Sequence, residues 1–182
     1  AIACAMAAHA TGRACKMRYD RDDDMMITGK RHDLRIKYRV GHDAEGRILG
    51  VEFTHLFRCG WSQDLSLPVA DRAMLHADNC YHLSDVRIES HRLRTNTQSA
   101  TAYRGFGGPQ GMIGIERVMD HAAFAVGRDP VSVRRANFYA DRADASGGSI
   151  SAKMKPQTTP YHMPVEDFIG GALVAELERT SD

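Results

Sequence analysis

Two stretches of alternating apolar and polar residues give the clearest structural pattern in the chain. Apolar residues occupy every second position over 34–40, where the intervening residues are basic, and again over 49–53. This period is typical of half-buried β-strands, and the basic face reads most simply as a solvated face. Asp43-Ala44-Glu45-Gly46 separates the two stretches and favours a turn. The pattern predicts an antiparallel hairpin over 34–57.

Helices are predicted where apolar residues recur every three or four positions between typical end signals. The longest one has Met112, Ile115, Met119, Ala122 and Val126 on its apolar face. Gly127 suits the end of that helix, and Asp129 followed by Pro130 begins another. The other predicted helices are a buried, Ala-rich helix over 1–10 that stops near Gly12, a short helix opened by Pro68 and running to about 77, and an amphipathic helix with Val165, Phe168, Ile169, Leu173 and Leu177 on one face.

The remaining segments are predicted from shorter patterns. Alternation over 14–19 and over 86–95 predicts two more strands. The acidic run 20–24 predicts a turn, and the Ser-, Gly-, Lys- and Pro-rich segment 140–160 predicts a surface connection within one domain. The expected fold class is α+β, with a hairpin-containing antiparallel sheet and packed helices.

The composition narrows the class of protein. The 24 Lys and Arg residues nearly balance the 23 Asp and Glu residues, so the 182-residue chain has a formal net charge of +1. This charge gives no electrostatic case for a nucleic-acid partner, and no apolar run approaches the roughly 20 residues of a membrane-spanning helix. The four cysteines lack Cys-x-x-Cys spacing and the nine histidines form no metal-binding pair, which favours free thiols in the cytoplasm.

A glycine-rich loop from Arg104 to Gly111 carries the candidate chemistry. Glycines let backbone N–H groups approach an anionic group, and the helix that follows points its positive end at the same place. Arg104 adds a planar donor fork, and Phe106 is expected to face a cavity. The residues predict a cofactor or phosphate site. A glycine-rich turn in which Phe106 plugs the core remains the competing interpretation, because the loop fits neither a Walker nor a Rossmann pattern.

Several motifs in register resemble the molybdenum-binding subunit of the xanthine dehydrogenase and aldehyde oxidase family. They extend over nearly the whole chain, as Asp24–His32, Gln63–Ser66, Asp78–Tyr81, Thr95–Thr97, Ala102–Gly111, Val133–Tyr139 and Thr159–His162. Several motifs in one order are far more specific than a single glycine loop.

The resemblance implies part of a molybdopterin-binding domain, with 1–182 as a piece of that domain. It implies a molybdenum–molybdopterin cofactor whose metal-bound hydroxide attacks a purine carbon next to a ring nitrogen, while hydride passes to a sulfido ligand. Hypoxanthine and xanthine are the implied substrates. Electrons would leave through 2Fe-2S and FAD centres in other domains or subunits of an oligomer.

The same resemblance assigns roles to individual residues. Arg104 matches an arginine beside the molybdenum, and Gly105, Gly107 and Gly108 match cofactor-contacting glycines. Phe106 matches the aromatic residue that packs on the substrate ring.

Arg72 matches an arginine that faces the substrate and is characteristic of the purine branch. Without the resemblance it would read as an ordinary surface arginine on a short helix.

The family's general-base glutamate and its second glycine loop are expected to lie outside this chain. We therefore expect no catalytic base within 1–182 and give Glu166, Glu176 and Glu178 no such role. An aldehyde or other N-heterocycle hydroxylase remains an alternative, as do a phosphate- or nucleotide-binding module and an interaction domain without a cofactor. The sequence leaves open whether the electron acceptor is NAD or oxygen.

Overall fold

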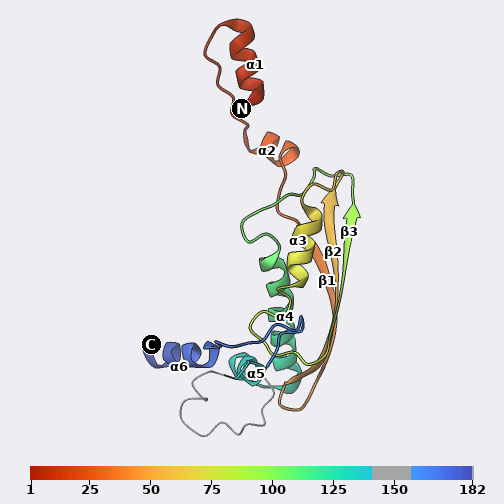
Figure 1. Ribbon diagram of the computed structural model, residues 1–182, viewed down its shortest axis with the longest axis vertical. Coiled ribbons are helices and arrows are strands. Elements are labelled where there is room, and N and C mark those ends of the chain that lie inside the picture. Colours follow the sequence, from red (N-terminus) through yellow and green to blue (C-terminus); the bar gives the residue numbers. More distant parts are fainter. Residues whose placement is uncertain (141–156, 182) are drawn as a thin grey trace.

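The alternating stretches form the predicted antiparallel hairpin in the computed structural model, which describes residues 1–140 and 157–181. β1 (Leu34–His42) pairs with β2 (Ile48–Gly60), and the register shifts between Gly41 and His42. β3 (Val86–Arg94) lies parallel to β2 on its other side, so the sheet order is β1-β2-β3 (Figure 1). The α+β class and the hairpin are confirmed, and the third strand makes the sheet mixed.

Helices α3 (Ser66–Met74), α4 (Gly108–Val126) and α5 (Pro130–Ala136) lie on one face of this sheet (Figure 1). Alternate residues of β2 point at them and are buried, because a strand presents every second side chain to the same face. These residues are Val51, Phe53, His55, Phe57 and Cys59. The core therefore sits between the central strand and α4, which contributes Ile115, Val118 and Met119.

The predicted end of the long helix and the predicted start of the next one are confirmed. Gly127 adopts the left-handed φ of 66° after α4, and the Asp129 carboxylate accepts a hydrogen bond from the Ser132 backbone N–H at 2.8 Å. The predicted apolar face is partly wrong, because Met112 is exposed. The buried stripe instead passes through Gly111 and Ile115, since the small glycine brings α4 against the backbone of α3.

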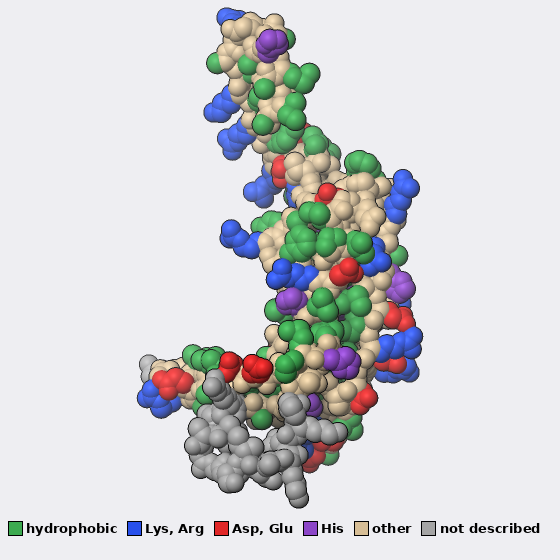
Figure 2. All heavy atoms as spheres, in the orientation of Figure 1, with side chains coloured by type: hydrophobic (Ala, Val, Ile, Leu, Met, Phe, Trp, Pro, Cys, Tyr) green, Lys and Arg blue, Asp and Glu red, His purple; other side chains and the backbone are tan. Residues whose placement is uncertain are grey.

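The N-terminal segment differs from its prediction. Helix α1 (Ile2–Thr11) forms and ends at Gly12, which has a φ of 63°, but α1 contains no buried residue. It projects from the body of the molecule, and hydrophobic side chains lie along its surface (Figures 1 and 2). Residues 14–19 are not a strand, because no strand of the described part lies beside them to complete their backbone hydrogen bonds.

The acidic run begins a helix instead of making a turn. The Asp20 carboxylate accepts a hydrogen bond from the Asp23 N–H at 2.8 Å and caps α2 (Arg21–Ile27). Three aspartates in the first turn complement the positive end of the helix dipole, which favours the helix.

The last helix is shorter than predicted. Helix α6 (Gly170–Thr180) begins after Val165, Phe168 and Ile169, and the Phe168 ring packs 5.6 Å from the ring centroid of Phe138. Most of the predicted 140–160 loop lies outside the described residues. No helix in the described ranges is long and apolar enough to span a membrane.

Candidate functional site

The glycine-rich loop has an unusual backbone just before α4. Gly105, Phe106 and Gly107 all have positive φ angles, at 95°, 49° and 97°. A Cβ on Gly107 would lie only 2.0 Å from the carbonyl oxygen of Val69 on α3. Glycine is required there both for the left-handed conformation and for the close approach. The loop is therefore seated directly on α3.

Unused hydrogen-bond donors gather in this loop. The Gly108 N–H donates to the Gly105 carbonyl at 3.0 Å, whereas the Gly105 and Gly107 N–H groups have no acceptor within the described residues. Helix α4 has no side-chain N-cap, so its positive end is uncompensated. Arg104 is exposed, and no carboxylate of the described part pairs with its guanidinium. Free amides, a helix N-terminus and an unpaired arginine together fit an anionic, phosphate-bearing cofactor.

The structure brings Arg72 to the same region. Val69 and Ala73 of α3 contact Gly107, and the His76 ring lies 3.5 Å from where a Cβ would stand on Gly108. Arg72 lies next to Ala73 on α3. It is exposed and forms no ion pair within the described ranges. Phe106 is half-buried in the glycine loop, which packs against α3. The predicted substrate residues thus belong to two elements packed against each other.

Arg31 lies within the Asp24–His32 motif, but no role in the site was predicted for it from the sequence. Its Nη2 donates a hydrogen bond to the Arg104 carbonyl at 2.6 Å, and its guanidinium carbon lies 4.4 Å from the centroid of the Tyr103 ring. Its Nη1 is buried without a hydrogen-bond partner and lies 3.9 Å from where a Cβ would stand on Gly105. Arg31 therefore clamps the loop from the side and leaves one cationic N–H group free beneath it.

A buried polar brace underlies both helices. The Nε2 atom of His32 lies 2.7 Å from Ser66 Oγ at the start of α3, and Gln110 Nε2 donates to the His32 carbonyl at 3.2 Å. Burial lowers the pKa of His32, which favours the neutral ring. Only the resemblance pointed to these residues, because they lie far apart in the sequence and share no local pattern.

Two glutamates of the last helix, for which no catalytic role was predicted, lie away from the loop. Glu176 pairs with Arg179 at 2.5 Å and Glu178 pairs with Arg135, both on or beside α6, which lies toward the C-terminal end of α4 (Figure 1). All four cysteines are free thiols. Within the described ranges, no three His, Cys, Asp or Glu side chains are grouped as a metal site. The loop consequently offers donors for an anionic group and no cluster of metal ligands.

Known proteins share both the sequence and the fold of this region. The molybdopterin cofactor-binding domain family matches residues 1–138. Xanthine dehydrogenase of Drosophila subobscura is 45% identical over 139 residues, and xanthine dehydrogenase/oxidase of Rattus norvegicus is 43% identical over 137 residues. These alignments cover 76% and 75% of this chain but 10% of each relative, so the chain spans about a tenth of their length.

A solved structure agrees over almost the whole chain. The aldehyde oxidoreductase from Desulfovibrio desulfuricans superposes with a TM-score of 0.75 and 25% sequence identity, covering 95% of this chain and 18% of that one. The loop geometry fits the cofactor for which the matching family is named, and the predicted resemblance is confirmed. This chain belongs to the molybdopterin cofactor-binding domain family.

Proposed function

We propose that this chain forms part of a molybdenum hydroxylase that oxidises purines such as hypoxanthine and xanthine at a carbon next to a ring nitrogen. The carrying observation is the exposed Arg72, unpaired within the described residues, on α3, the helix against which the glycine loop packs through Val69 and Ala73. Its guanidinium would stabilise negative charge that develops on the purine ring during oxidation. The relatives named xanthine dehydrogenase support the same substrate class.

In this proposal, the glycine-rich loop and Arg31 hold the cofactor. Arg104 and the free amides of Gly105 and Gly107 would bind the anionic part of a molybdopterin, with Gly108 at the helix end and Arg31 beneath. When bound, the molybdenum cofactor supplies the two-electron redox centre and the activated oxygen. Phe106 would pack on the substrate ring and orient it.

The wider enzyme is also part of the proposal. We place residues 1–182 in one molybdopterin-binding domain, with 140–160 as a connection inside it, because the family match over 1–138 is joined by a structural similarity that covers 95% of the chain. The electrons would pass to 2Fe-2S and FAD centres elsewhere in an oligomeric enzyme. Free cysteines are typical of a reducing cytoplasm, where we expect the protein to work.

A second candidate function is the oxidation of aldehydes. The observation that favours it is the similarity to an aldehyde oxidoreductase over 95% of the chain. An aldehyde develops its charge on a single oxygen and has no purine ring to stabilise, so Arg72 would be dispensable.

The substitution Arg72→Met in the molybdenum enzyme that contains this chain separates these two functions. Removal of one such donor costs on the order of 10²–10³ in kcat. We expect that loss with xanthine and little change with an aldehyde, measured at matched molybdenum content.

Arg128→Met is the matched control, because Arg128 is an exposed arginine after α4. It should leave both rates unchanged. Equal effects of Arg72→Met on both substrates would refute the purine assignment while leaving the cofactor site intact.

A further inference from the structure

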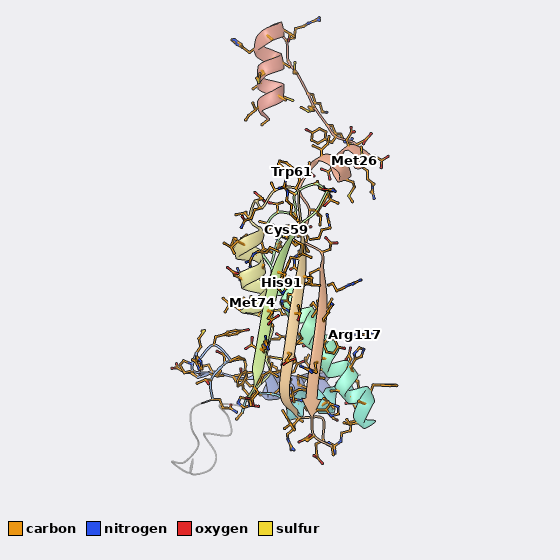
Figure 3. The ribbon with its side chains drawn as sticks, turned by 90° about the vertical axis from the view of Figure 1, so that its right-hand side faces the viewer. Met26, Cys59, Trp61, Met74, His91 and Arg117 are labelled. Atoms are coloured by element: carbon orange, nitrogen blue, oxygen red, sulfur yellow. The ribbon has the colours of Figure 1, made fainter. Side chains whose placement is uncertain are left out.

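Strand β1 forms one edge of the sheet and has an open side. The sheet order places β2 on one side of β1, and no strand of the described part lies on the other. Figure 3 shows this edge beside α4, where Arg117 is labelled. An uncovered nine-residue edge is a ready template for another strand.

The register of the hairpin determines which backbone N–H and C=O groups of β1 face the open side. The Arg58 N–H donates to the Asp33 carbonyl at 3.2 Å, and the pairing continues through Arg35 opposite Leu56. Antiparallel residues alternate between facing the partner strand and facing away from it. The backbone N–H and C=O groups at 34, 36, 38 and 40 therefore point away from β2, into the open side.

An apolar groove runs beneath the same edge. It encloses about 550 Å³ and is lined by Leu34, Ile36 and Tyr38 of β1 and by Ile113 and Arg117 of α4, among others. Ile113 is 65% exposed, although it lies on the longest helix of the described part. A strand added to β1 would place every second side chain over this groove.

The outer face of β1 carries uncompensated positive charge. Arg39 Nη2 pairs with Glu52 Oε2 at 2.6 Å, whereas Arg35 and Lys37 stand opposite Leu56 and Thr54. Both are exposed, and neither forms an ion pair within the described ranges. Residues directly opposite across a pair of strands interact, so a neighbour of β1 is favoured when it carries acidic side chains at these positions.

A second copy of the chain does not suit this edge. Two β1 strands paired with each other would bring the basic residues of one copy beside those of the other, and like charges across strands are destabilising. A strand in which apolar and acidic residues alternate would cover the groove with its apolar side chains. It would also hydrogen-bond to the outward-facing backbone groups of β1 and pair its carboxylates with Arg35 and Lys37.

We propose that the open edge of β1 binds one extended peptide segment in which apolar side chains alternate with Asp or Glu. This inference is independent of the proposed enzymatic function, because it concerns the backbone edge and the basic face of β1 and requires no molybdenum.

The test uses a fluorescein-labelled nonapeptide of alternating valine and glutamate, titrated with the purified enzyme that contains this chain in a fluorescence anisotropy assay. The comparison peptide replaces each glutamate with lysine. We expect the acidic peptide to bind roughly tenfold or more tightly than the basic one. The double substitution Arg35→Glu with Lys37→Glu should reverse that preference, in a variant whose circular dichroism spectrum matches that of the wild type.

The matched control is Arg13→Glu with Lys16→Glu, which changes the net charge equally on the exposed N-terminal segment. It should retain the preference for the acidic peptide. Equal binding of both peptides, or a preference that ignores the charge at 35 and 37, would overturn the proposal. So would a wild-type dimer that competes with the acidic peptide, because the edge would then belong to a second copy.

Discussion

The Nε2 atom of His32 lies 2.7 Å from Ser66 Oγ, and this contact joins the segment before β1 to the first turn of α3. His32 is 1% exposed and Ser66 is fully buried. The His32 carbonyl also accepts from Gln110 on α4, so one buried residue fixes the starts of both helices that carry the candidate site.

We predict that Ser66→Ala lowers the free energy of unfolding by about 1–3 kcal/mol, because it leaves the buried His32 ring without its partner. Urea unfolding followed by circular dichroism measures this loss. Ser84→Ala is the control: the exposed Ser84 hydroxyl donates to the Leu49 carbonyl at 3.2 Å, and its removal should cost less than about 0.5 kcal/mol. Equal losses for both variants would show that the buried His32–Ser66 contact contributes no more to the free energy of unfolding than an exposed hydrogen bond does.

Gly107→Ala should be among the most damaging single-methyl changes in the chain. A Cβ there meets the Val69 carbonyl at 2.0 Å, and alanine is also strained at a φ of 97°. We expect a loss of about 3 kcal/mol or more. Gly127→Ala isolates the conformational part, since Gly127 at the end of α4 has a φ of 66° with open space around it, and should cost only about 1–2 kcal/mol. A small effect at Gly107 would mean that the loop is not seated on α3.

Arg31 and Arg104 should both control cofactor retention in the molybdenum enzyme. Arg104→Ala removes an unpaired cation from the loop, and Arg31→Ala removes the hydrogen bond to the Arg104 carbonyl and the stacking on Tyr103. We expect each variant to retain about five- to tenfold less molybdenum per protein than wild type. Molybdenum is measured by elemental analysis of the purified protein. Arg18→Ala, an exposed residue outside the site, should retain the wild-type content.

The hairpin was predictable because each of its strands buries one face, so apolar residues recur at every second position in the sequence. The end of α4 and the start of α5 were predictable because Gly127 and Asp129 act locally. Features that depend on a partner far away in the sequence were not predictable. The parallel pairing of β3 with β2 joins segments separated by α3 and leaves no local pattern.

The same reason explains the incorrect predictions. Ala-rich α1 reads as a buried helix, but burial requires a covering surface, and none is found in the described part. Within the site, the glycine loop and the anion-binding character of Arg104 were visible locally, whereas the role of Arg72 came only from the resemblance. The clamp by Arg31 and the His32–Ser66 contact depend on packing that no spacing rule encodes.

His55 makes the stability of the fold sensitive to pH. It is fully buried on β2 between Phe53 and Phe57, and neither ring nitrogen has a hydrogen-bond partner. Burial lowers the pKa of His55 to about 4, compared with about 6.5 for an unfolded histidine. Between these pH values the unfolded chain binds more protons than the folded chain. The free energy of unfolding must therefore fall as the pH drops from about 6.5 to about 4, and this contribution levels off below that.

We predict that His55 alone accounts for about 3 kcal/mol of this acid-induced loss. His55→Leu replaces an unpartnered polar ring with an apolar side chain, so it should raise stability at pH 7 by about 1 kcal/mol and remove this part of the pH dependence. Carboxylates such as Asp43, whose pKa is lowered by hydrogen bonds from the Arg47 and Glu45 backbone, are common to both proteins and cancel in the comparison. Urea unfolding of both proteins from pH 4 to pH 8 measures the difference. Parallel stability curves would show that His55 finds a partner for its proton in the folded chain.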